Sequence, residues 1–406
     1  MKKKTAILIT TSLLAYTLMD TDCNAATPEE NRPLSERNEQ TLKEIIVKEH
    51  RPIPVFTASG VVATALANPT RVSEKQKQGF EEREFTLPYN IHVGALVKIV
   101  DPQAPYILST HGFLSDKEAN AVRNYLGVSE RYLQNYNQVI LDHPTSSAFV
   151  AANKQAAFGG KEEGYMLTKV AQQLKAEGAT SVHLLGVSLG GLGVLHAAFR
   201  GKETIDSVVA FSAVTDMLDI PAAALRTVTP DGACGERYQS WSTLSTAIGL
   251  RDLLPPLLDA AHTFPEYKDA SFENVCDFFF KTKRYENEEY MKELYAPYIE
   301  RKILPDRLPV NTVEYLAQSN ASLIAQHIEV PVFLIHAADD PAVSPAHYHN
   351  FMLAAKGNDF VQGMILRNGG HNGFTAAYGR RWEGCVLKTD VDYWSAEKVT
   401  FDKECF

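Results

Sequence analysis

The segment from residue 181 to residue 199 constrains the fold of this chain more than any other part of the sequence. It begins with the apolar run Ser181-Val-His-Leu-Leu, passes through Gly186-Val-Ser-Leu-Gly-Gly191, and continues as the helix-forming stretch 192–199. A chain that turns sharply from a strand into a helix needs glycines beside the central residue, because side chains there would collide with neighbouring backbone. The pattern predicts that Ser188 lies at a helix N-terminus, as a candidate nucleophile.

Two later segments contain the groups that an activated serine requires, in the order acid and then base. The apolar run 331–335 leads directly into His336-Ala-Ala-Asp-Asp340, which predicts an acid at the carboxyl end of a buried strand. A second apolar strand is expected at 360–366, and His371 follows it in a glycine-rich loop. These residues predict a base at His371 and an acid at Asp339 or Asp340.

Serine chemistry of this kind also needs donors for the negative charge that develops on a carbonyl oxygen. The apolar strand 106–110 is followed by the loop His111-Gly-Phe-Leu114, which lies where such a donor is expected. The two predicted oxyanion donors are the backbone N–H groups of Phe113 and Leu189. His143, which follows another apolar strand, is expected to line the rim of the pocket.

Taken together, four motifs resemble the α/β-hydrolase superfamily over residues 80 to 375: His111-Gly-Phe, the Gly-Val-Ser-Leu-Gly-Gly turn, Ala337-Ala-Asp-Asp-Pro and Gly369-Gly-His-Asn-Gly-Phe. The last two are similar to a branch of hydrolase-domain carboxylesterases and lipases. This resemblance implies acyl esters of lipids or of short-chain alcohols as substrates. In the superfamily the acid closes a Gly-x-x-Asp-x-x-Val pattern, which favours Asp340, with Ala337 in the glycine position, over Asp339.

Each candidate residue also has an ordinary structural interpretation. Ser188 could belong to a phosphate-cradling turn, but the sequence has neither the Gly-x-Gly-x-x-Gly pattern with a downstream acid nor a terminal Gly-Lys-Ser/Thr. Asp340 could simply cap the next helix, and His371 could be an unremarkable loop residue, with other histidines available as bases. The order of the three residues and their placement at strand ends favour a Ser188-His371-Asp340 triad that transfers an acyl group to water without a cofactor.

The same machinery serves several substrates. We expect a small-molecule or lipid carboxylic ester, but a thioesterase or a peptidase or amidase would use the same three residues. A hydrolase-fold binding protein without turnover is the alternative from a different class. The formal net charge of -9 argues against a nucleic-acid partner, and membrane contact is expected only through a lipid substrate.

The first 26 residues have the layout of a secretory signal peptide. A basic head, Met1-Lys-Lys-Lys, precedes a largely apolar run of about fifteen residues and a polar segment that ends in small residues at Ala25 and Ala26. The apolar run is shorter than the roughly twenty residues of a spanning helix, and Asp22 makes Cys23 a poor lipidation site. The prediction is export to a secreted or periplasmic location.

Cysteine usage agrees with an oxidising compartment, because removal of the signal peptide leaves an even number of cysteines. Four cysteines allow three pairings, and position in the chain suggests Cys234 with Cys276 and Cys385 with Cys405. Four unpaired thiols remain the alternative. No metal site is expected, because no cysteines or histidines fall at zinc-ligand spacing on a recognisable scaffold.

The alternation of apolar strands with helical segments predicts an α/β fold: a mostly parallel, twisted sheet with helices on both faces. A helix is expected at 164–177, and the expected strands are 83–87, 93–100, 106–110, 138–142, 181–185, 207–211, 332–335 and 360–366. The predicted domains are a signal peptide at 1–26, an N-terminal extension at 27–78, core segments at 79–213 and 331–406, and an inserted helical cap at 214–330. The cap is rich in apolar residues, some of which would line a substrate channel above Ser188.

Overall fold

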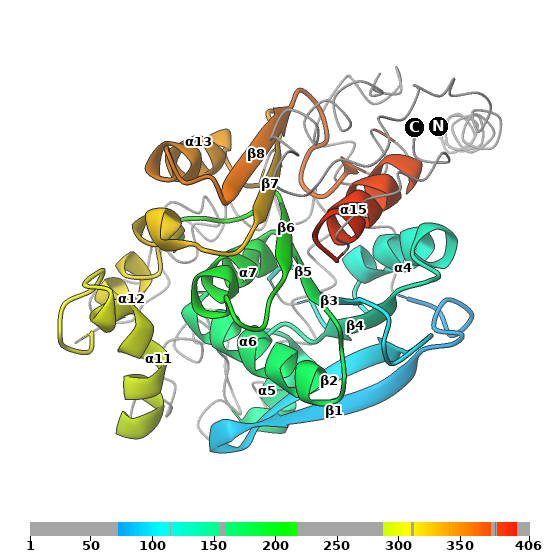
Figure 1. Ribbon diagram of the computed structural model, residues 1–406, viewed down its shortest axis with the longest axis horizontal. Helices are drawn as coiled ribbons and strands as arrows, with labels where there is room; N and C mark the ends of the chain where they lie inside the picture. The colour runs from blue at the N-terminus through cyan, green and yellow to red at the C-terminus, as the bar shows by residue number, and fades with distance from the viewer. Residues whose placement is uncertain are drawn as a thin grey trace, which may run out of the picture.

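An eight-stranded sheet organises the described part of the chain in the computed structural model of the protein (Figure 1). The structure describes residues 72–113, 115–154, 157, 160–217, 287–309, 312–340, 342–374, 378 and 380–395. The strands are β1 (Glu81–Leu87), β2 (Ile91–Lys98), β3 (Tyr106–Thr110), β4 (Asn137–Leu141), β5 (Val182–Val187), β6 (Ser207–Phe211), β7 (Val332–Ala337) and β8 (Val361–Leu366). All eight strand predictions are confirmed to within two residues at each end.

The strands lie in the order β1-β2-β4-β3-β5-β6-β7-β8. The first two form an antiparallel hairpin, and β2 pairs antiparallel with β4. Every pair from β4 to β8 is parallel, which confirms the mostly parallel sheet. Because parallel neighbours end at the same edge, the residues that follow β3, β5, β7 and β8 meet there.

Helices cover both faces of the sheet, as the alternating pattern predicts (Figure 1). The helices are α4 (Asn120–Tyr132), α5 (Ser147–Asn153), α6 (Lys161–Ala176), α7 (Leu189–Arg200), α11 (Glu288–Glu300), α12 (Thr312–Ala317), α13 (Pro345–Ala354) and α15 (Arg380–Ser395). Short 3-10 turns lie at η3 (Pro88–Asn90), η8 (Ala321–Leu323) and η9 (Ala325–His327). Helix α6 begins three residues before its predicted start.

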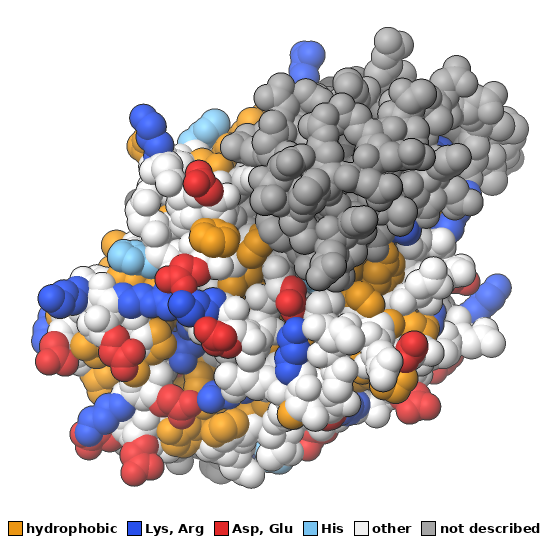
Figure 2. Space-filling model, in the orientation of Figure 1, with side chains coloured by type: hydrophobic (Ala, Val, Ile, Leu, Met, Phe, Trp, Pro, Cys, Tyr) orange, Lys and Arg blue, Asp and Glu red, His pale blue; other side chains and the backbone are white. Residues whose placement is uncertain are grey.

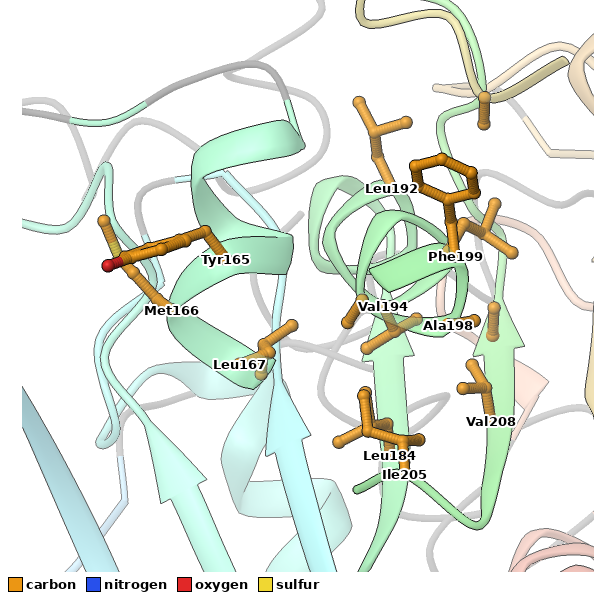
Figure 3. Close-up of a cluster of buried hydrophobic side chains, with 14 of the residues drawn as sticks. Tyr165, Met166, Leu167, Leu184, Leu192, Val194, Ala198, Phe199, Ile205 and Val208 are labelled. Atoms are coloured by element: carbon orange, nitrogen blue, oxygen red, sulfur yellow. The ribbon is translucent and has the colours of Figure 1, made fainter. Parts of the chain in front are cut away.

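Alternate side chains of the central strands enter two separate cores, because side chains point to opposite faces of a strand in turn. Leu184 and Val208 pack with α6 and α7 on one face (Figure 3). Leu185 and Val209, their neighbours along the same strands, pack with α4 and α15 on the other face. The sheet is therefore buried on both sides, which explains why its strands are continuous apolar runs.

The segment at 312–319, within the predicted cap, is anchored to the first turn of α6. The ammonium of Lys161 is fully buried and donates to the Tyr315 carbonyl at 3.1 Å and to Ser319 Oγ at 2.8 Å. It also lies 4.3 Å from the centroid of the Tyr315 ring. Burial lowers the pKa of Lys161 well below its usual value.

The outer surface near this segment is polar. Basic and acidic side chains are interspersed on the face shown in Figure 2, and ion pairs join Lys292 to Glu288 on α11 and Arg307 to Glu314 on α12. Exposed pairs of this kind contribute little to stability.

Several predictions fall outside the described residues. These are the signal peptide at 1–26, the N-terminal extension up to residue 71, most of the cap, and the cysteines Cys234, Cys276 and Cys405. The predicted domain boundaries and both cysteine pairings therefore stay predictions. Within the part of the chain that is described, no helix is long and apolar enough to span a membrane.

Candidate active site

Ser188 occupies the sharp turn between β5 and α7. Its backbone has φ 59° and ψ -118°, a strained conformation for a residue with a side chain. A Cβ atom on Gly190 would lie 2.5 Å from the His111 carbonyl oxygen, and one on Gly186 would lie 2.5 Å from the Gly190 carbonyl oxygen. The glycines are thus required by close backbone approach, as predicted.

The structure brings Ser188, His371 and Asp340 into one hydrogen-bonded chain. His371 Nε2 lies 2.9 Å from Ser188 Oγ, and His371 Nδ1 lies 3.0 Å from Asp340 Oδ2. Because a carboxylate only accepts, Nδ1 carries the proton and Nε2 is free to accept the hydroxyl proton of Ser188. The His371 side chain is 14% exposed, so solvent can reach this group of three residues at the imidazole.

Asp340 is held as an ionised, buried acid. Its Oδ1 accepts the backbone N–H groups of Ala342 at 2.8 Å and Val343 at 2.9 Å, which leaves Oδ2 to accept from His371. Burial alone would raise the pKa of Asp340. The charge and hydrogen bond of His371, with the N–H of Val343, outweigh it, so the pKa lies below its usual value.

The neighbouring carboxylate makes a different contact. Asp339 Oδ1 accepts the backbone N–H of Gly370 at 2.8 Å. It therefore joins the loop after β7 to the loop after β8, one residue before His371. The geometry places Asp340, rather than the alternative Asp339, on the imidazole.

Two of the other histidines, His336 and His347, make contacts away from Ser188. His336 is buried, its Nε2 donates to the Val343 carbonyl at 3.1 Å, and burial lowers its pKa. His347 Nδ1 accepts the N–H of Thr215 at 3.2 Å. His143 was expected at the pocket rim, but this expectation is wrong: it is only 1% exposed, and its Nε2 lies 3.3 Å from the buried Glu163 carboxylate.

The predicted oxyanion donors lie on segments that flank Ser188. The Cα–Cβ direction of Gly112 points at Ser188, since a Cβ atom there would lie 3.2 Å from Ser188 Oγ. The loop that contains Phe113 therefore passes beside the serine hydroxyl. Leu189 is the first residue of α7, where backbone N–H groups have no acceptor within the helix. Donation by Phe113 and Leu189 remains a prediction.

Sequence reasoning missed a buried acid behind the loop. Glu163 accepts the Thr110 hydroxyl at 2.7 Å, and its other oxygen lies 3.3 Å from His143 Nε2. The Glu163 carboxylate fits there because Gly193 has no Cβ atom, which would overlap it. The Lys161-Glu-Glu163 triplet suggests a solvated helix start, and no local signal shows that Glu163 supports the end of β3.

A family model of the alpha/beta hydrolase fold matches residues 163–376, which contain the turn, the acid and the histidine. The chain belongs to the α/β hydrolase fold family. No curated protein sequence matches this hydrolase. Among its described residues, no group of three or more His, Cys, Asp or Glu side chains could hold a metal ion.

Solved structures that this hydrolase resembles include an esterase from Pyrococcus furiosus, with 15% identity, a TM-score of 0.47, and coverage of 81% of this chain and 100% of that one. An acylaminoacyl peptidase from Pyrococcus horikoshii has 14% identity and a TM-score of 0.45, over 80% of this chain and 43% of that one. Dipeptidyl peptidase 4 from Porphyromonas gingivalis has 14% identity and a TM-score of 0.40, over 72% and 32%.

Proposed function

We propose that this hydrolase cleaves carboxylic esters through a covalent acyl-enzyme on Ser188. The observation that carries the proposal is the hydrogen-bonded chain from Ser188 Oγ through the His371 imidazole to Asp340. A nucleophile, a base in contact with it and an acid that orients the base are the parts that acyl transfer requires.

In the first half of the reaction, Ser188 Oγ attacks the ester carbonyl while His371 Nε2 takes the hydroxyl proton. The imidazolium that forms is stabilised by Asp340, which stays ionised. His371 then gives the proton to the departing alcohol oxygen as the carbon–oxygen bond breaks. In the second half, His371 Nε2 takes a proton from water, the water attacks the acyl carbon, and Ser188 regains its proton.

The negative oxygen of each tetrahedral intermediate is assigned to the N–H groups of Phe113 and Leu189. Backbone donors fixed beside the nucleophile need no rearrangement when charge develops, which is why such sites lower the barrier. Support comes from the position of the Gly112 loop against Ser188 and from the place of Leu189 at the start of α7.

For the substrate we propose esters with short or medium acyl chains, including those of lipids, acted on outside the cytoplasm. The Asp-Asp-Pro and Gly-Gly-His-x-Gly-Phe loops, similar to those of carboxylesterases and lipases, support an ester substrate, and residues 1–26 support export. If apolar cap side chains line a channel, each added methylene contributes about 0.8 kcal/mol until the channel is full. We expect p-nitrophenyl esters of medium chain length to be cleaved with a higher kcat/KM than the acetate.

Ser188→Ala tests the proposal. It should lower kcat for p-nitrophenyl ester hydrolysis by about a million-fold and abolish labelling by a fluorophosphonate, because the members of a triad act as a unit. Ser212→Ala is a matched control: Ser212 is also buried with a positive φ of 45°, and its hydroxyl has no partner among the described residues. The control should keep full activity. Activity of Ser188→Ala within tenfold of the parent would refute the proposal.

A further inference from the structure

A small cavity lies directly behind the candidate active site, on the sheet face that α4 and α15 cover. Its volume is about 30 Å³, and its walls come from β5, β6, α4, α15 and the loops after β3 and β8. Five polar side chains line it: His111 from the loop that contains Phe113, Asn372 from the loop after β8, Asn124 and Tyr125 from α4, and Glu383 from α15.

Three of these side chains, His111, Tyr125 and Asn372, present buried polar atoms that no described neighbouring group satisfies. Both ring nitrogens of His111, the Tyr125 hydroxyl and Asn372 Oδ1 have no hydrogen-bond partner among the described residues. His111 and Tyr125 are each only 2% exposed, so bulk solvent does not reach them. Leaving one buried polar atom unpaired costs about 1 to 3 kcal/mol, and four such atoms around one cavity indicate a bound partner.

The chemistry of the lining selects the partner. Burial lowers the pKa of His111 to about 3, with the nearby His143 adding to the effect, so the imidazole is neutral and offers one donor and one acceptor. Tyr125 can also donate and accept, whereas Asn372 Oδ1 only accepts. A metal cation needs acceptors alone, and an anion needs donors alone. Water satisfies the mixed set, and a cavity of this volume has room for about two water molecules.

We propose that the cavity is a binding site for one or two ordered water molecules, which join the His111 loop to the His371-Asn372 loop through Tyr125. The functional part of this inference rests on the proposed esterase activity. The loop after β3 contains the predicted oxyanion donor Phe113, and the loop after β8 contains the base. A water bridge between them fixes the distance from the donor to the base without contact with the substrate, so Tyr125 is a positioning residue.

The first test is an experimental structure of the full chain at a resolution that shows ordered water. We expect one or two water molecules within 3.2 Å of a His111 nitrogen and of Asn372 Oδ1, a usual hydrogen-bond distance. The same water should be present in Ser188→Ala, so this result does not depend on the catalytic proposal. A dry cavity, or a His111 ring that turns to a protein partner, would overturn the site.

The second test measures the link between the loops. Tyr125→Phe removes one partner of the water and keeps the ring, and we expect kcat to fall about fivefold, the size of one net hydrogen bond, with KM within about twofold. Tyr295→Phe is the matched control, because Tyr295 is equally buried, its hydroxyl is also unpartnered among the described residues, and it does not line the cavity. Equal kcat values for the two variants would show that the water does not position the loops.

Discussion

Replacing Asp340 by Asn separates the role of the acid's charge from that of its shape. Asn can still accept the N–H groups of Ala342 and Val343 through Oδ1, so the loop should keep its conformation. The NH₂ group would then face His371 Nδ1 and favour the wrong tautomer, and the imidazolium would lose its counter-charge. At 3.0 Å and an effective dielectric constant of about 20, that charge stabilises the imidazolium by about 5 kcal/mol.

This energy corresponds to a fall in kcat of about ten-thousand-fold, similar to the effect of the same change in a serine protease triad. The assay is hydrolysis of p-nitrophenyl butyrate, with Ser188→Ala protein as the background. Asp339→Asn is the matched control. Its amide oxygen can still accept the Gly370 N–H, so we expect a loss of less than about tenfold. A larger loss for Asp339→Asn than for Asp340→Asn would refute the assignment of the acid.

Two further predictions concern stability and covalent structure. Asp390 on α15 is buried, burial raises its pKa to about 7, and its main hydrogen bond comes from the Ser207 hydroxyl. The folded protein therefore keeps a proton on Asp390 that the unfolded chain releases above about pH 4. The contribution of Asp390 to the free energy of unfolding therefore falls as the pH rises from about 4 to about 7. Asp390→Asn should raise the Tm by several degrees at pH 8 and change it little at pH 4; equal shifts at both pH values would contradict this. Mass spectrometry of exported, non-reduced protein should find the disulfides Cys234–Cys276 and Cys385–Cys405. Four free thiols would contradict both pairings.

The strands and the meeting of Ser188, Asp340 and His371 could be predicted because their signals are local. Parallel strands buried on both faces are short apolar runs, and the structure places β3 and β6 at the predicted bounds. Parallel strands also end at one edge, so Ser188, Asp340 and His371, each shortly after a strand, were expected at the same edge of the sheet. Asp339 and Asp340 are adjacent, and the direction of the backbone at the end of β7 decides which side chain contacts His371. Only the structure shows that direction.

The start of α6 and the cavity could not be predicted because their partners are distant in sequence. Lys161 and Glu163 belong to a charged triplet that suggests exposure. The structure buries Lys161 against Ser319, 158 residues away, and Glu163 against Thr110, 53 residues away. Tyr125 is one of several aromatic residues on or near α4. The sequence does not show that the His111 loop packs against its ring, which places the Tyr125 hydroxyl at the cavity.

The sheet order has a consequence for the growing chain on the ribosome. Strand β6 ends at residue 211, and β7, which pairs with it in the finished sheet, begins about 120 residues later. At roughly 5 to 20 residues per second, synthesis leaves that side of β6 without β7 for about 6 to 24 seconds. An apolar strand with unpaired N–H and C=O groups is a template for pairing with other chains. Translation pauses before residue 332 should therefore promote aggregation, and a nascent chain of that length contains Ser188 but neither Asp340 nor His371.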